Sequence, residues 1–256
     1  MYTWKSETKR NNSELFPETF RALIIGESNA GKTCLLFKLL LEDYLDYDHL
    51  IVVGDSLYQE NYKILKQMYE VGHSQKYARK FFSLQEVVKK ECSLSTENII
   101  NALDRGEGNP VTVEYYGSSD KIPDPSDLED ANYCVVFDDV MTRKNQEIMK
   151  SYFTRGRHKR AIVFYLSQSY FALDRQAIRI NSNVLILFRL SSIDLQNLHK
   201  DRIQLDMSLI EFREFCNETW SIPYNFVMIN FDCTAASGKR YRKNLDDFFV
   251  PSSQKE

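Results

Sequence analysis

Five short apolar runs recur along the chain, separated by stretches with helical spacing. The runs are near-continuous, which is typical of strands buried on both faces of a parallel sheet. They cover residues 20–25, 49–54, 133–138, 161–167 and 184–188. Apolar residues return every three or four positions in the helices predicted at 34–41, from the end of the third run to about 154, at 193–205 and at 208–220. The pattern predicts an α/β fold with a mainly parallel central sheet flanked by helices.

Other segments have weaker patterns. Residues 58–71 have helical spacing, with three large side chains on one face: Tyr62, Leu65 and Tyr69. Short helices are predicted at 81–90 and 95–105. Glycines and prolines among acidic residues predict an insertion or loop at 106–130. The alternating run at 225–231 predicts a late edge hairpin.

These elements fit one domain over residues 19–235, because 256 residues suffice for one large α/β domain. Residues 1–18 read as a polar lead-in. Residues 236–256 read as a tail that is first basic and then acidic and aromatic.

Composition narrows the class of protein. No apolar run approaches the roughly 20 residues that span a bilayer, and the polar start lacks the apolar core of a signal peptide. The five cysteines are scattered without a C-x-x-C pair, which favours a reducing, intracellular compartment without a disulfide framework or zinc site. The net charge of −3 argues against coating nucleic acid by bulk charge but allows a local basic patch. The basic run at 239–243 could be such a patch or simply a solvated chain end.

The first apolar run leads into a Walker A motif, Gly26-x-x-x-x-Gly31-Lys32-Thr33, with a helical run directly after it. Strand, glycine loop and helix N-terminus are the setting in which this motif cradles phosphates with backbone N–H groups. Lys32 would reach the β- and γ-phosphates of ATP, and Thr33 would hold Mg²⁺. The predicted nucleotide-binding residues are Gly26, Glu27, Ser28, Asn29, Ala30, Gly31, Lys32, Thr33 and Cys34.

The third apolar run ends as a Walker B motif in Asp138 and Asp139. Asp138 is expected at the carboxyl end of its strand, beside the glycine loop, where it would hold Mg²⁺ with Thr33. Asp139 is then placed to orient or deprotonate the attacking water. A pair of capping aspartates at a strand end would be the structural alternative.

Gln168 follows the next apolar run in a Ser-Gln-Ser sequence. A polar side chain at this edge can touch the γ-phosphate or the lytic water, so Gln168 is the candidate sensor. The alternative is a turn in which the serines hydrogen-bond their own backbone.

A basic cluster at 155–160 precedes the same run, and we expect it near one edge of the nucleotide site. An arginine there could stabilise transition-state charge on a neighbouring subunit's γ-phosphate. Arg157 is the first candidate for this arginine finger, Arg155 the second and Arg179 the third. A solvated face or a DNA contact would explain the cluster equally.

In order, the chain carries Walker A, Phe-Asp-Asp, Arg-Gly-Arg-His-Lys, Leu-Ser-Gln-Ser-Tyr and Ile-Arg-x-Asn-Ser-Asn. Over about residues 20–190 this order resembles the FtsK/HerA-type genome-packaging ATPases of large DNA viruses, including poxviruses, and of Polinton/Maverick elements. The resemblance implies an additional-strand P-loop ATPase fold, with roles for Lys32, Thr33, Asp138, Asp139 and Gln168 like those above.

The resemblance further implies a homo-oligomeric ring that hydrolyses ATP with Mg²⁺ and translocates double-stranded DNA of any sequence. The genome would be viral or virus-like and the destination a capsid, so a capsid or portal-like protein would be the docking partner. The implied location is the host-cell site of virion assembly, with association with the virion.

Other nucleotide-binding classes fit less well. No Asn-Lys-x-Asp motif indicates a GTPase, and no Leu-Ser-Gly-Gly-Gln-like signature indicates an ABC ATPase. A small-molecule kinase stays open, since the arginine-rich segment could be a lid over a phosphorylated substrate. A nucleotide-bound assembly scaffold is disfavoured by the complete set of Lys32, Thr33, Asp138 and Asp139.

Overall fold

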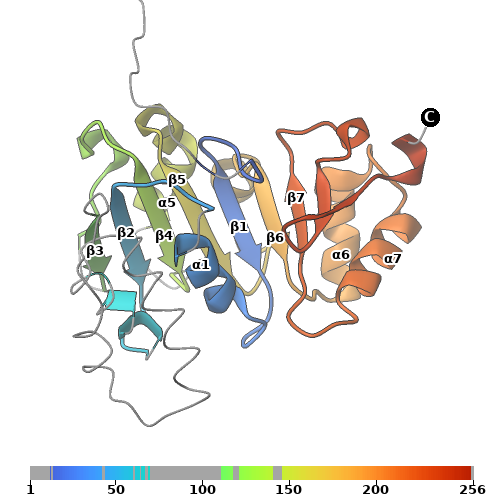
Figure 1. Ribbon diagram of the computed structural model, residues 1–256, viewed down its shortest axis with the longest axis horizontal. Helices are drawn as coiled ribbons and strands as arrows, with labels where there is room; N and C mark the ends of the chain where they lie inside the picture. Colours follow the sequence, from blue (N-terminus) through green and yellow to red (C-terminus); the bar gives the residue numbers. More distant parts are fainter. Residues whose placement is uncertain are drawn as a thin grey trace, which may run out of the picture.

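The computed structural model describes residues 12, 14–41, 44–59, 61–63, 65, 66, 69, 111–117, 121–140 and 146–254. Within these ranges nine strands form one sheet (Figure 1). In chain order they are β1 (Arg21–Ile25), β2 (His49–Gly54), β3 (Thr112–Tyr116), β4 (Tyr133–Asp138), β5 (Ile162–Ser167), β6 (Val184–Leu187), β7 (Val227–Asn230), β8 (Tyr241–Lys243) and β9 (Asp247–Phe249). Their order across the sheet is β3-β2-β4-β5-β1-β6-β7-β8-β9.

The first six strands in that order are parallel, and β7, β8 and β9 continue the sheet antiparallel. The prediction of an α/β fold with a mainly parallel sheet is therefore confirmed. Strand β5 lies between β1 and β4, since Val163 pairs with Arg21 on one side and Val135 on the other. This arrangement confirms the additional-strand topology that the motif order implied.

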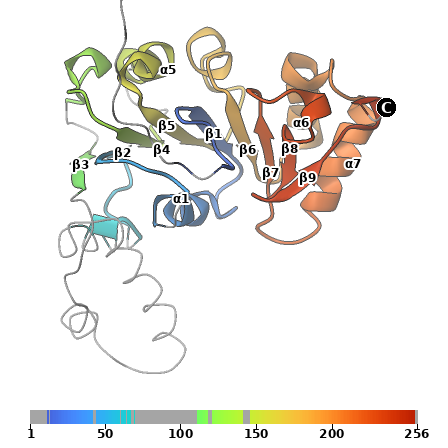
Figure 2. The same cartoon turned by 45° about the horizontal axis from the view of Figure 1, so that its top comes forward.

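Helices cover both faces of the sheet, with α1 on one side and α5 on the other (Figure 2). The α-helices are α1 (Lys32–Leu41), α5 (Gln146–Arg155), α6 (Ser192–Leu198) and α7 (Leu209–Thr219). Short 3-10 helices are Pro125–Asp127, Gly156–Lys159, Ala235–Ser237 and Ser252–Gln254, and π-helices are Arg175–Arg179 and His199–Ile203. In the described ranges, none of the helices is long and apolar enough to cross a bilayer.

The core has two layers because side chains alternate along each strand. Ala22 and Ile24 of β1 point to the layer that α1 covers. Leu23 and Ile25 point to the layer that contains apolar residues of α5, α6 and α7. The start of α7 is set by Ser208, whose hydroxyl accepts the amide of the third helical residue.

Several segments differ from their sequence-based prediction. The stretch 106–130 contains edge strand β3, whose exposed and half-buried residues lack a continuous apolar run. Strand β7 pairs antiparallel with β8, as a hairpin does, but it is not at the edge of the sheet, because the tail at 236–256 supplies β8 and β9 beyond it. The short helices predicted at 81–90 and 95–105 lie outside the described residues.

Candidate nucleotide-binding site

The loop from β1 to α1 takes its shape from a few backbone positions. Gly26 leaves no room for a side chain, because a Cβ there would lie 2.6 Å from Cβ of Phe188. Asn29 and Gly31 have φ angles of 61° and 101°, a region that asparagine and glycine tolerate. The Gly26 amide donates to the Ser167 carbonyl at 3.2 Å. The loop is thereby tied to the carboxyl end of β5.

Lys32 begins α1, and its ammonium group turns back into this loop. Nζ donates to the carbonyl oxygens of Gly26 at 2.7 Å and Glu27 at 2.8 Å. Burial lowers the pKa of Lys32, while the nearby carboxylates of Asp138 and Asp139 act in the opposite direction. The fold thus brings Lys32 within electrostatic range of both acids that the sequence paired with it.

Asp138 ends β4 and has a partner that no motif indicated. The phenol of Tyr62 donates to Oδ2 of Asp138 at 2.5 Å. Burial raises the pKa of the Asp138 carboxyl, and the hydrogen bond from Tyr62 acts in the opposite direction. The Tyr62 ring also packs edge-on against Phe37 of α1, with 5.5 Å between centroids. Tyr62 therefore joins the helix after the glycine loop to the Walker B strand.

Asp139 follows with a φ of 52°, a left-handed conformation that turns the chain away from the sheet. Its side chain is exposed. A carboxylate that is open to solvent, one residue after the strand, can accept a hydrogen bond from a water beside the phosphates.

Gln168 is exposed at the carboxyl end of β5, between β1 and β4. The two flanking serines form the turn: the Ser167 hydroxyl donates to the Ser169 carbonyl at 3.0 Å and accepts the Ser169 amide at 3.2 Å. The turn that was the alternative for the Ser-Gln-Ser sequence is present, and the sensor role of Gln168 stays a prediction. The serines hold the turn, and the glutamine is placed at the edge that carries Asp138.

A cleft of about 650 Å³ lies beside the loop. One wall consists of loop and α1 residues from Asn29 to Lys38, and the other is aromatic, with Phe188, Tyr224 and Phe226. Gln59 and Asn61, from the segment after β2, also line it. A polar wall with backbone donors beside an aromatic wall suits a nucleotide, whose phosphates and base differ in this way.

The residues that would hold Mg²⁺ fit that ion in chemistry. Thr33 offers a hydroxyl oxygen beside Lys32, and Asp138 offers a carboxylate at the end of β4, which β5 separates from β1. Mg²⁺ takes oxygen ligands and is commonly held by one or two protein groups together with substrate phosphates.

The basic cluster 155–160 lies at the opposite ends of the parallel strands from this site, contrary to the sequence-based expectation. It precedes β5, so it sits at the amino ends of the parallel strands, whereas the glycine loop sits at their carboxyl ends. A five-residue strand spans about 16 Å at ~3.3 Å per residue, which separates the two edges. The predicted parallel sheet already contained the signal, because residues that precede a parallel strand lie at its amino end and residues that follow one lie at its carboxyl end.

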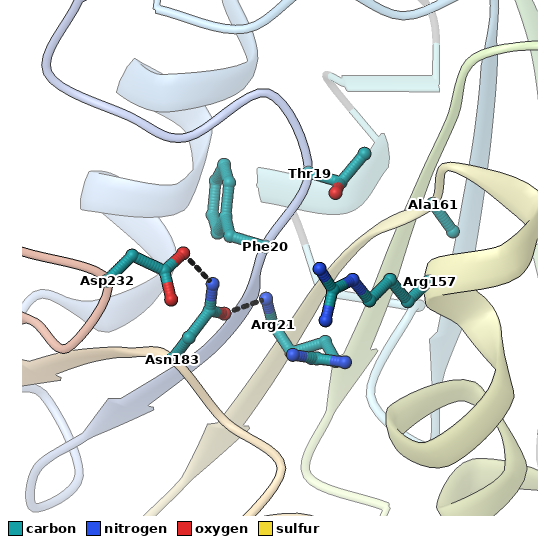
Figure 3. Close-up of a pocket in the computed structure, with 7 residues that line it drawn as sticks. All are labelled: Thr19, Phe20, Arg21, Arg157, Ala161, Asn183 and Asp232. Carbon is teal, nitrogen blue, oxygen red and sulfur yellow. Dashed lines mark hydrogen bonds between the residues drawn. The ribbon is translucent and has the colours of Figure 1, made fainter.

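Three of the cations in the cluster have partners within the chain. Arg155 pairs with Asp124 at 3.0 Å and Arg160 with Glu18 at 2.9 Å. Lys159 donates to the Leu128 carbonyl at 2.7 Å. Arg157 is exposed and makes no side-chain hydrogen bond or ion pair with any residue that the structure describes. Its guanidinium faces Arg21 in a small pocket (Figure 3).

Arg179, the third finger candidate, is an internal structural residue. It is only 8% exposed and pairs with Asp201 at 3.4 Å. Its guanidinium also stacks over the rings of Tyr170 and Phe171, with 5.1 and 4.9 Å to the centroids. A side chain held in this way is not available to a neighbouring subunit.

The glycine loop between β1 and α1, the acid at the end of β4 and the intervening β5 together define the fold of a P-loop NTPase with an additional strand. No protein-family model matches the sequence. No curated protein matches it either.

Solved structures with a similar fold include the genome packaging NTPase B204 from Sulfolobus turreted icosahedral virus 2 in complex with AMP. The TM-score is 0.49 at 10% identity, over 90% of this chain and 98% of that chain. VirB4 of Thermoanaerobacter pseudethanolicus gives 0.48 at 8% identity, over 99% and 93%. EssC ATPases 2 and 3 from Geobacillus thermodenitrificans give 0.45 at 14% identity, over 93% of this chain and 40% of that chain. At such identities the likeness concerns the fold alone.

Proposed function

We propose that this protein binds ATP with Mg²⁺ at the loop between β1 and α1 and hydrolyses it. The observation that carries the proposal is that Lys32, within electrostatic range of Asp138 at the carboxyl ends of the parallel strands, lines a cleft large enough for a nucleotide. Lys32 neutralises charge on the phosphates, and Thr33 and Asp138 hold the metal, which neutralises further charge. Asp139 takes the proton of the attacking water, and Gln168 orients that water.

We further propose that the working form is a homo-oligomeric ring in which Arg157 acts on the neighbouring subunit's ATP. Arg157 and the glycine loop lie at opposite edges of one sheet, so one subunit cannot use both at its own site. A head-to-tail contact brings the amino edge of one copy to the carboxyl edge of the next, and a contact of this kind closes into a ring if its rotation allows.

The proposed work of the ring is translocation of double-stranded DNA, with packaging of a viral or virus-like genome into a capsid. The order of motifs over about residues 20–190 supports this. Docking to a capsid or portal-like protein at the host-cell site of virion assembly belongs to the same proposal.

The basic run at 239–243 does not supply the DNA contacts of such a motor, because three of its cations have partners within the chain. Arg242 is buried, with 2% exposure, and donates to the Leu15 carbonyl at 2.8 Å. Arg240 pairs with Asp206 at 2.5 Å and Lys243 with Glu218 at 2.6 Å. These side chains hold β8 in the domain.

The position of the arginine-rich segment 155–160 does not support the kinase alternative. A lid over a phosphorylated substrate has to reach the phosphates of ATP, yet the arginine-rich segment lies at the other edge of the sheet. No further observation favours phosphoryl transfer to a small molecule.

The experiment that tests the motor is steady-state ATP hydrolysis against protein concentration, with and without linear duplex DNA, alongside oligomer mass. We expect turnover per subunit to rise as oligomers form and to rise again with DNA of unrelated sequences, and this stimulation should fall with salt. A verified monomer with a concentration-independent rate that DNA leaves unchanged at low salt would contradict the motor and revive the kinase. Absence of hydrolysis under all conditions would favour the scaffold.

A further inference from the structure

The pocket at the amino edge of the sheet gathers residues from four separate segments (Figure 3). It has a volume of about 150 Å³ and is lined by Thr19, Phe20, Arg21, Arg157, Ala161, Asn183 and Asp232. The volume suits a group of a few heavy atoms. The two guanidinium groups face the same space from different elements, Arg21 from β1 and Arg157 from the 3-10 helix after α5.

Placing two permanent cations together is unfavourable unless an anion joins them. The pocket contains one carboxylate, Asp232, so its formal charge is +2 − 1 = +1. Asp232 accepts the side-chain amide of Asn183 at 2.6 Å. Asn183 in turn accepts the Arg21 backbone amide at 2.7 Å. Asp232 is thus held by a neutral partner, and its carboxylate forms no ion pair with Arg21 or Arg157.

The hydrogen-bonding capacity of both arginines is largely unused. The Arg21 side chain donates once, from Nη1 to the Phe153 carbonyl at 3.5 Å, which is at the long limit for a hydrogen bond. Its Nε is buried and has no partner. Burial and the charge of Arg157 lower the pKa of Arg21, while the charge of Asp232 acts in the opposite direction. Free donors in a planar fork beside a second cation match the oxygens of a phosphate group.

We propose that Arg21 and Arg157 together form a phosphate-binding pocket that takes the terminal phosphate group of a nucleotide held by a neighbouring copy of this chain. Arg21 has no role in the proposed function above, and this proposal adds it to the site. It lies at the start of β1, and the glycine loop follows the end of the same strand. The choice of a nucleotide as the source of phosphate rests on the proposed function. The phosphate chemistry of the pocket does not.

Binding of inorganic triphosphate to the Lys32→Ala protein tests the pocket alone, because this variant weakens the chain's own phosphate loop. At constant ionic strength, calorimetry should detect binding, and adding Arg21→Gln or Arg157→Gln should weaken it about tenfold each. Arg160→Gln is the matched control, as Arg160 is ion-paired in the same cluster, and it should leave the affinity unchanged. Equal affinity in all four proteins would overturn the pocket.

Arg157 is exposed, so Arg157→Gln should fold, and Arg21→Lys keeps the charge at the second position while removing the fork. If triphosphate binds with these differences but the wild type does not hydrolyse ATP, the pocket stands and the proposed function fails. The two failures are therefore distinguishable.

The source of the phosphate is tested with mixed subunits. Arg21→Gln protein should hydrolyse ATP poorly, and mixing it with Lys32→Ala protein, which supplies an intact pocket, should restore turnover. The alternative source is the DNA backbone. If Arg21→Gln instead leaves hydrolysis unchanged and reduces the slope of log affinity for duplex DNA against log salt by about one, the assignment to a neighbour's nucleotide is overturned.

Discussion

The phenol of Tyr62 donates to Asp138 at 2.5 Å, although 76 positions separate them in the chain. Tyr62 is 2% exposed and lies between α1 and the end of β4. The hydrogen bond satisfies one oxygen of a carboxylate that is itself half-buried. The bond also fixes the orientation of the carboxylate, so the tyrosine positions the acid.

Tyr62→Phe removes this bond while keeping the ring. We expect a loss of about 1–3 kcal/mol in unfolding free energy, because a half-buried carboxylate loses a donor. The Mg²⁺ concentration needed for nucleotide binding should also rise. Urea denaturation and a Mg²⁺ titration at fixed nucleotide measure the two effects. Tyr58→Phe is the matched control, since Tyr58 is 73% exposed, and it should change neither. A Tyr62→Phe protein with wild-type stability and Mg²⁺ response would show that the contact has no positioning role.

Gly26→Ala and Gly156→Ala form a second matched pair. A Cβ at Gly26 would lie 2.6 Å from Phe188 Cβ, so the loop has to shift and nucleotide affinity should fall. A Cβ at Gly156 would meet its nearest atoms at 3.8 Å, and the backbone there is not left-handed. Gly156→Ala should therefore be neutral or stabilise by about 0.4–1 kcal/mol. Nucleotide titration and thermal unfolding of both variants check the contrast. Equal nucleotide affinity of the two variants would show that nucleotide binding does not depend on the close contact between Gly26 and Phe188.

Lys32→Ala should lose nucleotide affinity and hydrolysis together, because it removes the charge that faces the phosphates. The measurement is equilibrium binding of a nucleotide analogue, followed by turnover at saturating ATP. Tight binding by a folded Lys32→Ala protein would exclude the glycine loop as the phosphate site.

Asp139→Asn should bind ATP normally, and its turnover should fall by about 100-fold or more. The amide keeps the shape of the side chain but cannot take a proton. Asp130→Asn, another exposed aspartate, serves as the control and should hydrolyse at the wild-type rate. If Asp139→Asn matches the wild-type rate, another group handles the lytic water.

Arg157→Ala should bind ATP normally but hydrolyse it about 10³-fold more slowly, as expected when an arginine finger is lost. Mixing it with Lys32→Ala should restore part of the rate, since hybrid interfaces then contain one intact finger and one intact loop. Arg155→Ala removes a side chain that pairs with Asp124, and its rate should stay close to wild type. Verified mixed oligomers without recovery would count against action in trans.

Local sequence determined much of the scaffold. The apolar runs at 49–54 and 133–138 became β2 and β4 with the same bounds, because a strand buried on both faces needs apolar residues at every position. The glycine loop is likewise local: a strand, a few special backbone positions and a helix start lie within about a dozen consecutive residues. Gly26, Lys32 and Asp138 could be named from such patterns alone.

Only the tertiary structure determined which distant residues these segments contact. Strands β3 and β9 consist of exposed and half-buried residues, and β8 has only three residues. The identity of these strands comes from their pairing in the sheet. The sequence pattern predicted Tyr62 only as a core residue of a helix. The hydrogen bond from Tyr62 to Asp138 is visible only in the folded structure. Arg155 and Arg157 are two positions apart, yet one has a carboxylate partner and the other faces Arg21. Sequence spacing sets local conformation, whereas strand order and direction determine which distant side chains share an edge, and that is a property of the folded chain.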